Sequence, residues 1–200
     1  MIELPPYQQN VIVELLLSDG WLAFSSSKNK NARLGVEQSY SHKAYVHFVF
    51  SILSHYCNSL PVYKKRVGKG NTTYSIGFIT RALPCFTELH SIFYVNNVKR
   101  IPHNIYELLT PVTLAHLIMG DGYRRGGLFL CTDSYTVQDV VRLQNVLIIR
   151  YNLSCSLRLH AEGHYWIYIL KKSLVHLSSI VRPHMESSFL YKIGRFTLLL

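Results

Sequence analysis

Two aspartates are the first candidates for chemistry, because each ends an apolar stretch of the same kind. Leu114–Gly122 ends in an Asp-Gly pair, and so does Ile12–Gly20, which makes Asp121 and Asp19 the two acids. If both stretches are helices, each carboxylate lies in a last turn, where the helix already carries partial negative charge and an acid costs roughly 0.3–1 kcal/mol. A bound cation would remove that conflict, and carboxylate and carbonyl oxygens are ligands that suit Mg²⁺.

Small residues precede both acids, Ser18 and Gly120, and small side chains let two helix backbones approach closely. Metal ions between or beside two nearby carboxylates offset their repulsion, activate water and stabilise a leaving oxygen, which is the chemistry of phosphodiester hydrolysis. Gly20 and Gly122 occupy the place where a left-handed residue commonly ends a helix. A plainer interpretation is two buried helices that each end in an Asp-Gly turn. Repetition half a chain apart in a basic protein favours the metal site.

The two stretches resemble the two copies of the LAGLIDADG motif of homing endonucleases. The matched residues are the motif's last acid, at Asp19 and Asp121, and its final glycine, at Gly20 and Gly122. The resemblance covers nearly the whole chain. In Leu108–Gly122, followed by Gly127–Ser134, it is to the double-motif, intron-encoded type from fungal organelles.

The third motif position departs from the family pattern. It is often glycine, but here it is Glu14 in the first copy and His116 in the second. Either side chain could be tolerated there if it faced away from the helix pair. Glu14 also leaves open that the first copy has drifted from the active form.

The resemblance implies an α+β fold of two pseudo-twofold-related αββαββα halves. Each half would carry a four-stranded antiparallel, saddle-like sheet, with the motif helices packed at the domain interface. Residues 1–100 would form the first half, and residues 101–200 the second half with a C-terminal helical tail. It further implies a monomer that makes a staggered cut across the minor groove of a long, asymmetric duplex site. Mg²⁺ would be the cofactor, with Mn²⁺ as a substitute, and the protein would be mitochondrial and organelle-encoded.

Hydrophobic periodicity independently predicts the same order of elements in both halves. In the first half we expect a helix to about residue 19, a hairpin over 21–40, a helix over 42–56, a strand from 60, a basic turn over 63–71, a strand over 72–79 and a helix over 87–94. In the second half we expect a helix over 105–121, a basic turn over 123–127, a strand over 128–132, a helix over 137–151, strands over 154–159 and 165–170, a helix over 174–181 and a tail over 182–200.

Further site residues are assigned from their places in this repeat. We expect Asp19 and Asp121 to bind metal together with neighbouring backbone carbonyls at Gly20 and Gly122. Gln38 and Asp133 are predicted to occupy matching strand ends, where they would orient water or contact phosphate. Lys171 is placed where proteins of this family carry a lysine that stabilises phosphate charge, and its counterpart in the first half is Thr80. Each of these residues also has a plain structural interpretation, as a polar strand end or a solvated lysine.

Composition points to a polyanionic partner. Lys and Arg number 21 against 11 Asp and Glu, which gives a net charge of +10, with 10 His in addition. Such an excess favours nucleic acid over a membrane surface, since no lysine-rich amphipathic helix stands out. The candidate DNA-binding residues are Lys28, Lys30, Arg33, Lys64, Lys65, Arg66, Lys69, Arg124, Arg125, Arg158 and Lys172.

Several other classes find no support in the sequence. The four cysteines form no CxxC pair, so free thiols are expected rather than a zinc site. No secretory signal, transit peptide or apolar span of about 18 residues stands out. Three hypotheses remain: an active homing endonuclease, a nucleic-acid-binding module such as a maturase that binds host intron RNA, and a basic structural component of a ribonucleoprotein. Retention of both acids favours the first.

Overall fold

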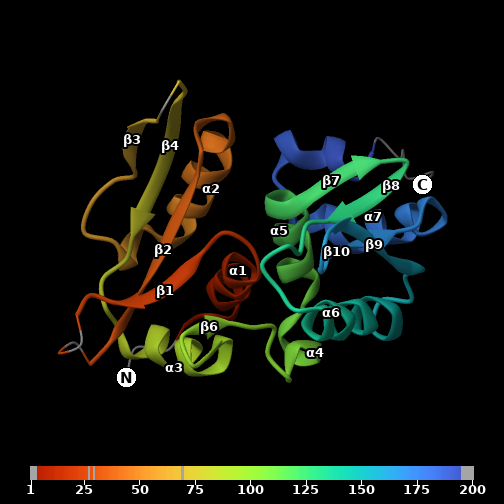
Figure 1. The fold of residues 1–200 in the computed structure, drawn as a ribbon, viewed down its shortest axis with the longest axis horizontal. Coiled ribbons are helices and arrows are strands. Elements are labelled where there is room, and N and C mark those ends of the chain that lie inside the picture. Colours follow the sequence, from red (N-terminus) through yellow and green to blue (C-terminus); the bar gives the residue numbers. More distant parts are fainter. Residues whose placement is uncertain (1–3, 27, 29, 69, 195–200) are drawn as a thin grey trace. The chain divides into compact units, whose positions relative to one another are not determined.

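The computed structural model describes residues 4–26, 28, 30–68 and 70–194. The chain divides into two compact units, Met1–Ile92 and Phe93–Leu200, which Figure 1 shows as a ribbon. None of the helices formed by the described residues is long and apolar enough to cross a membrane.

The first unit is a four-stranded antiparallel sheet with helices before, between and after its two hairpins. Its elements are α1 Pro6–Leu17, β1 Trp21–Phe24, β2 Ala32–Ser39, α2 Lys43–Leu53, β3 Val62–Val67, β4 Thr72–Ile79 and α3 Pro84–Phe93. The strand order is β1-β2-β4-β3. Alternate strand residues point to the same side, and on one side Leu34, Val36, Ile76 and Phe78 are buried. Helix α2 contacts β2 and β4 and so covers part of this sheet.

The second unit repeats this plan after a short connecting region. Its elements are β5 Tyr94–Val95, β6 Val98–Lys99, α4 Ile105–Leu108, α5 Pro111–Asp121, β7 Gly122–Arg125, β8 Gly127–Leu130, α6 Val137–Ile149, β9 Cys155–Ala161, β10 His164–Ile169 and α7 Leu174–Val181. The strand order β7-β8-β10-β9 is the same as in the first unit. Buried Leu128, Leu130, Ile167 and Ile169 form the core side of this sheet.

Local sequence explains where the second-unit helices begin. Pro111 opens α5 at the position where its missing N–H is not needed, and the Thr110 hydroxyl accepts a hydrogen bond from the N–H of Thr113 at 3.2 Å. Thr136 caps α6 in the same way through the N–H of Asp139, at 3.3 Å. A threonine cap of this kind is worth about 1 kcal/mol.

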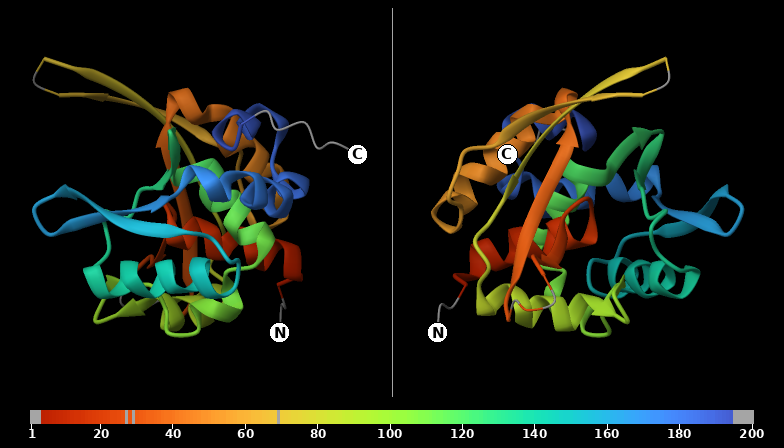
Figure 2. Two further views of the ribbon diagram at one scale, coloured as in Figure 1. Left: turned by 90° about the vertical axis from the view of Figure 1, so that its right-hand side faces the viewer. Right: turned by 60° about the vertical axis from the view of Figure 1, so that its left-hand side comes forward.

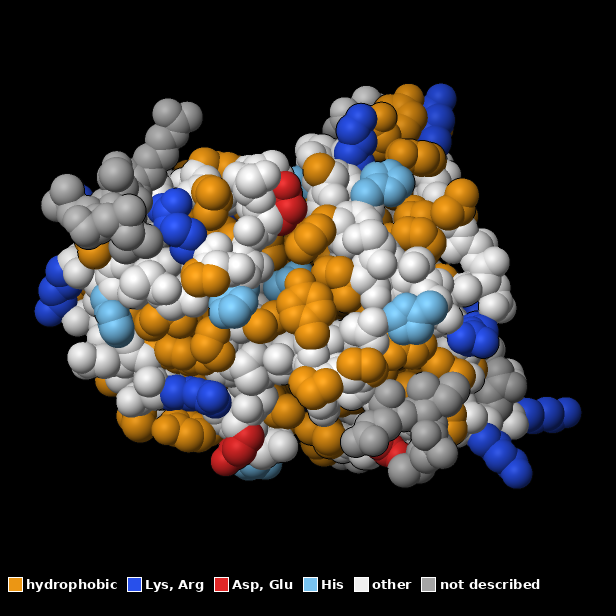
Figure 3. Space-filling view, turned by 180° about the vertical axis from the view of Figure 1, so that it is seen from behind, with side chains coloured by type: hydrophobic (Ala, Val, Ile, Leu, Met, Phe, Trp, Pro, Cys, Tyr) orange, Lys and Arg blue, Asp and Glu red, His pale blue; other side chains and the backbone are white. Residues whose placement is uncertain are grey.

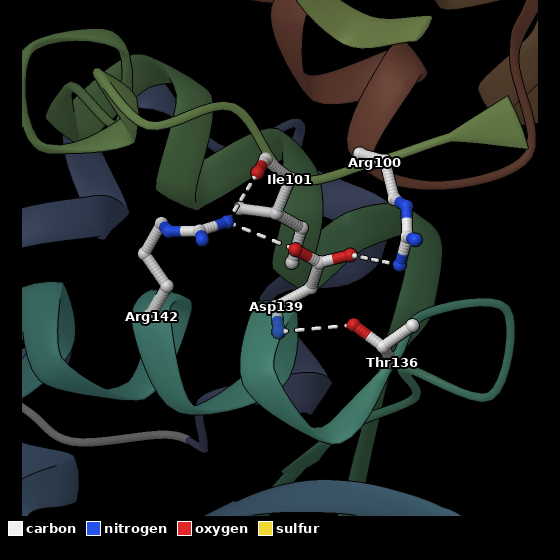
Figure 4. A network of polar contacts seen from close by, with 5 residues as sticks. All are labelled: Arg100, Ile101, Thr136, Asp139 and Arg142. Atoms are coloured by element: carbon white, nitrogen blue, oxygen red, sulfur yellow. Dashed lines mark hydrogen bonds and ion pairs between the residues drawn. The ribbon is translucent and has the colours of Figure 1, made fainter. Parts of the chain in front are cut away.

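Asp139 also fastens the connecting region to α6 (Figure 4). Its two carboxylate oxygens accept from Arg142, at 2.9 Å, and from Arg100, at 3.4 Å. Arg142 donates in addition to the carbonyl of Ile101, at 2.7 Å. The carboxylate is buried and lies in the first turn of α6, where the helix N-terminus favours negative charge. These contacts fix residues 100 and 101 against the second unit.

The predicted α+β class and the αββαββα order are confirmed, and two predicted turns are wrong. The basic segment 63–71 is mostly strand, since β3 continues to Val67, and the basic segment 123–127 forms β7 and the start of β8. In both hairpins the basic residues extend the ribbon instead of capping it. In Figure 2 the β3–β4 and β9–β10 hairpins extend as long twisted ribbons beyond the helices of their own units.

Candidate catalytic centres and nucleic-acid surfaces

The first motif acid, Asp19, lies in a turn just after α1. Its side chain is exposed, and its Oδ2 accepts a hydrogen bond from Nε2 of Gln38 on β2 at 2.5 Å. The amide oxygen of Gln38 is 3.2 Å from Nδ1 of His42, which follows β2. The structure therefore brings the predicted residues Asp19 and Gln38 together. It adds His42, which no pattern around position 42 singled out.

Neither motif glycine has the predicted left-handed conformation. Both positions require glycine instead because a Cβ there would clash with the preceding helix. Gly122 has φ −74° and ψ 131°, which any residue can adopt, and Gly20 is absent from the described glycines with positive φ. A Cβ on Gly122 would lie 2.4 Å from the carbonyl oxygen of Ile118, and one on Gly20 would lie 2.6 Å from that of Leu15. Because it has no side chain, each glycine allows the following strand to begin in direct contact with the last turn of its motif helix.

The second motif acid differs from the first in its local structure. Asp121 is the last residue of α5 and is partly buried, whereas α1 ends two residues before Asp19. The backbone carbonyl of Asp121 accepts from the N–H of Cys131 at 3.2 Å. Beside it lies Lys192 of the tail, whose Nζ is 2.6 Å from the carbonyl oxygen of Met119 and 3.3 Å from that of Gly120. Sequence reasoning treated the tail as an appendage and missed this lysine.

The third motif position is buried in both copies. Glu14 and His116 are both 0% exposed. Glu14 accepts hydrogen bonds from the hydroxyl of Tyr45 at 2.8 Å and from that of Ser18 at 3.0 Å. Burial, together with the charge of His184, lowers the pKa of His116 to about 4, so this imidazole is neutral at physiological pH.

Strand register corrects the predicted match between Gln38 and Asp133. Trp21 pairs with Gly35, and Tyr123, which occupies the same place after its motif, pairs with Phe129. Counting along both strands from these pairs makes Thr132 the counterpart of Gln38. Thr132 is buried, and its hydroxyl donates to the carbonyl of Tyr165 at 2.5 Å.

Asp133 is instead held on the second sheet by ring nitrogens. Its Oδ1 lies 2.8 Å from Nδ1 of His160, and its Oδ2 accepts from the indole N–H of Trp166 at 2.7 Å. The carbonyl of Asp133 lies 2.7 Å from Nδ1 of His164. These partners give Asp133 a role on the sheet surface.

Lys171 lies just after β10, as predicted, at the start of the short helix Lys171–Ser173, and its role in the reaction stays a prediction. Gly122 pairs with Leu130, which pairs with Ile167, so Ile167 marks the level of the motif acid on β10. Lys171 follows four residues later, two residues beyond the end of β10.

Thr80 is not the counterpart of Lys171. The backbone N–H of Thr80 donates to the carbonyl of Leu34 on β2. Leu128 is the residue equivalent to Leu34 in the second sheet, and it pairs with Ile169, so Ile169 is the counterpart of Thr80. The Thr80 hydroxyl accepts from the N–H of Leu34 at 3.0 Å, which is a structural role.

Comparison with known proteins identifies the family. Residues 9–177 match the model of the LAGLIDADG DNA endonuclease family. The chain belongs to this family.

Two curated relatives of this LAGLIDADG protein are maturases. The chain is 31% identical over 173 residues to the cytochrome b mRNA maturase bI2 of Debaryomyces hansenii, covering 84% of this chain and 66% of that protein. It is also 31% identical over 200 residues to the maturase bI2 of Saccharomyces cerevisiae, covering 94% of this chain and 47% of that protein. The chain thus spans between about half and two thirds of these relatives.

Solved homing endonucleases share the fold. The structure of I-WcaI bound to its DNA recognition sequence matches with a TM-score of 0.89 at 24% identity, covering 98% of this chain and 90% of that chain. Structures of I-DmoI in complex with DNA and Mn, or with its target DNA in the presence of Mg, match with TM-scores of 0.51 and 0.53.

The exposed face of the first sheet carries charged side chains around one carboxylate. Glu37 accepts from Lys64 and from Arg66, each at 2.6 Å, and from the hydroxyl of Ser75 at 2.8 Å. The hydrogen bond from Lys64 is the largest influence that lowers the pKa of Glu37. A groove beside this network is lined by Tyr40, Tyr63, Lys64, Lys65, Tyr74 and Ser75.

The other basic candidates of the first unit surround the β1–β2 connection. Lys28 and Lys30 are exposed there, and Arg33 is partly exposed on β2. Lys69 lies outside the described residues. Figure 3 shows one face of the molecule, on which the blue Lys and Arg side chains are more abundant than the red Asp and Glu side chains.

The exposed face of the second sheet is aromatic. The ring of Phe129 lies 4.6 Å from that of Tyr168 and 6.0 Å from that of Trp166, and His160 stacks on Trp166 at 3.8 Å. Arg158 lies over the ring of Tyr168 at 5.3 Å.

The basic candidates near this face are divided between the surface and the interior. Arg125 and Lys172 are exposed. Arg124 instead shares the side of β7 with Gly122, and its guanidinium lies against Gly194 of the tail. Its role in DNA binding stays a prediction.

None of the four cysteines is in a disulfide bond. Cys85 is buried and the other three are partly exposed. Burial raises the pKa of Cys57 to about 11 and that of Cys155 to about 12, so neither is a reactive thiolate at neutral pH. Within the described ranges no three His, Cys, Asp or Glu side chains gather into a metal-holding group.

Proposed function

We propose that this protein is a monomeric, sequence-specific homing endonuclease that hydrolyses both strands of a long, asymmetric DNA site with a divalent metal. The observation that carries the proposal is the carboxylate at the end of each motif helix in a family of DNA endonucleases. Cleavage of the host gene's intron-free copy would promote intron mobility. A mitochondrial location, with the protein encoded in the organelle, is part of this proposal.

The residues around Asp19 fit a hard divalent cation. The carboxylate is exposed, and its neighbour Gln38 carries a second oxygen donor. Oxygen ligands of this kind suit Mg²⁺ and Mn²⁺, and the carbonyl of Gly20 would complete the predicted set. When bound, the metal would activate water and stabilise the leaving oxygen. Gln38 orients the Asp19 carboxylate through its amide N–H, and His42 in turn lies within hydrogen-bond distance of the Gln38 amide oxygen.

The second acid is proposed to serve the second strand. Asp121, next to Gly122, is the corresponding acid in the second motif. Its surroundings differ from those of Asp19, because a buried lysine lies on the last turn of its helix. Asp133 stays in the proposal as a sheet-surface residue that contacts DNA, while Lys171 is assigned no part in the reaction.

The two sheet faces supply the affinity in this proposal. Lysine and arginine contacts to phosphates release counterions, so binding weakens steeply as salt increases. The charged face of the first sheet, with Lys64, Lys65 and Arg66, suits the duplex backbone and base edges. The different faces of the two sheets support a target whose two halves are not identical.

A second candidate function is that of an intron-splicing maturase that binds host intron RNA. It is favoured by the two bI2 maturase relatives and by the aromatic face of the second sheet. Rings on an open sheet stack on unpaired bases, which are the usual targets of sequence-specific RNA recognition.

Cleavage of a randomised and an intron-junction duplex library with Mg²⁺ tests the first function. We expect discrete cuts from the natural protein and, in Asp19→Asn and Asp121→Asn, at least about a hundredfold slower cutting of one strand each. Glu107→Gln is the matched control, because it changes an exposed acid of the second unit and leaves both motif acids in place. Tight, salt-dependent binding of intron RNA with no DNA cuts would reject the endonuclease and favour the maturase.

A further inference from the structure

The tail after α7 delivers a buried lysine to the second motif helix. Within the short helix Ser187–Lys192, the side chain of Phe189 is buried, and Lys192 itself is 6% exposed. Its Nζ donates to the carbonyls of Met119 and Gly120, at 2.6 and 3.3 Å, and lies 5.5 Å from the ring of Phe189. Lysine is almost never this buried unless its charge is paired. The contact is therefore a built feature of the second unit.

The place that Lys192 occupies is one where a cation is favourable. The last carbonyls of a helix have no intrahelical partner, and together they carry partial negative charge. In α5 the carboxylate of Asp121 adds a full negative charge to the same turn. An ammonium group on the carbonyls of Met119 and Gly120 satisfies both oxygens and offsets this charge. The ammonium group thus supplies the positive charge that a metal ion would otherwise supply at the end of α5.

Near the end of the first motif helix, two backbone carbonyls and the motif carboxylate accept hydrogen bonds from neutral groups. The carbonyls of Glu14 and Leu15 accept from the backbone N–H groups of Ser18, at 3.0 Å, and Gly20, at 2.7 Å. The carboxylate of Asp19 accepts from the neutral amide of Gln38. Among the ion pairs formed by the described residues, none involves Asp19. At this helix end the carboxylate charge is left for a cation from solution.

We propose that Lys192 is the built-in cation of the second centre, so that divalent metal binds at Asp19 and only weakly at Asp121. A metal ion on the carbonyl of Gly120 and the carboxylate of Asp121 would lie beside the ammonium, and like charges repel. The residues of the second centre thus do not fit a tightly held metal, whereas those at Asp19 do. This inference rests on the proposed metal-dependent function and assigns its metal requirement to one of the two acids.

Binding of Mn²⁺ alone, measured by electron paramagnetic resonance on the full chain with and without non-specific duplex DNA, tests the assignment. We expect one site in the natural protein, lost in Asp19→Asn and retained in Asp121→Asn. In Lys192→Met we expect a second site at least about tenfold tighter than any second binding to the natural protein. That second site should disappear when Asp121→Asn is added.

Two further variants separate charge from packing. Lys192→Arg keeps the positive charge and should retain the single site. Lys171→Met removes an exposed lysine from the same unit and should also change nothing. If Lys192→Met does not fold, the comparison of Asp19→Asn with Asp121→Asn in the natural background still shows which of the two acids binds Mn²⁺.

Two equal Mn²⁺ sites in the natural protein, each lost with its own acid, would overturn the assignment of Lys192, as would the absence of any Mn²⁺ site. Two equal sites would leave the proposed endonuclease intact. The endonuclease proposal fails on a different observation, namely the absence of DNA cuts.

Discussion

The two units share a strand order but differ in the groups around equivalent backbone positions. Both follow αββαββα with the order first-second-fourth-third strand, and both motif glycines avoid the same clash with a helix carbonyl. Yet Asp19 is exposed beside a neutral amide, while Asp121 ends a helix capped by Lys192. A repeated scaffold therefore constrains the backbone at each centre, whereas the polar neighbours come from residues that the repeat does not match.

The same contrast holds on the sheet faces. On the first sheet, Glu37 forms ion pairs with Lys64 and Arg66. The strand register places Cys131 at the equivalent position of the second sheet. There the polar group is Asp133, which holds His160 and Trp166. One face presents charged side chains around a carboxylate, and the other presents packed rings. Substitutions at equivalent positions should therefore have unequal effects.

The largest expected effect concerns the third motif position, where the second copy has His116. Burial lowers the pKa of His116 to about 4, below its ordinary value of 6.5, so the unfolded chain binds the proton more readily than the folded one. The contribution to stability is present above pH 6.5 and is lost as pH falls toward 4, by about 3 kcal/mol in all. Urea unfolding across this range measures it.

His116→Leu removes the titrating group from the buried site and should flatten this part of the pH dependence. The matched control is His103→Leu, which changes an exposed histidine of the same unit and should leave the slope unchanged. Equal slopes for the natural protein and His116→Leu would show that the imidazole titrates freely, which contradicts its burial.

A smaller expected effect compares Gln38 with its register counterpart Thr132. Gln38 contacts the Asp19 carboxylate directly, and loss of such a supporting group typically lowers metal affinity or activity by about 10- to 100-fold. We expect Gln38→Leu to slow single-turnover DNA cleavage by that factor. Thr132→Val removes a hydroxyl that bonds to Tyr165 and should lower the free energy of unfolding by about 1 kcal/mol with the cleavage rate kept.

Comparable losses of activity in Gln38→Leu and Thr132→Val would mean that the two centres are more alike than their side chains indicate. A cleavage assay that labels each strand separately makes the comparison sharper. Gln38→Leu should slow the cut that depends on Asp19 and leave the cut that depends on Asp121.

Sequence reasoning predicted the elements with strong periodicity and failed where contacts are long-range. The alternation of Leu34 and Val36, or of Ile167 and Ile169, indicated which strand faces are buried. The match of Gln38 with Asp133 failed by one residue, because it compared residue types without the pairing that sets register.

Two other errors have the same origin. Strand β3 is exposed at all six residues, so it carries no alternation, and its lysines resembled a turn. The contact of Lys192 with α5 joins residues more than seventy positions apart, and no local sequence pattern predicts it.

The smallest expected effect concerns Glu37, whose charge is shared by Lys64 and Arg66. Because the hydrogen bond from Lys64 lowers the pKa of Glu37 below its ordinary value of 4.5, its contribution to stability is present above that pH and is lost as pH falls through the lower folded value. Glu37→Gln should therefore lower the free energy of unfolding at pH 7 slightly, by less than about 1 kcal/mol for such partly exposed pairs. The same change frees two cations on the charged face and should tighten non-specific duplex binding.

A salt titration of that binding decides what Lys64 and Arg66 do on the first sheet. If Glu37 holds both cations away from phosphates, Glu37→Gln should steepen the dependence of log affinity on log salt by about one to two phosphate contacts. The control is Asp133→Asn on the second sheet, whose partners are His160 and Trp166 and which should leave the slope nearly unchanged. An unchanged slope in Glu37→Gln would instead show that Glu37 orients Lys64 and Arg66 toward DNA, so that the two sheets use their acids in the same way.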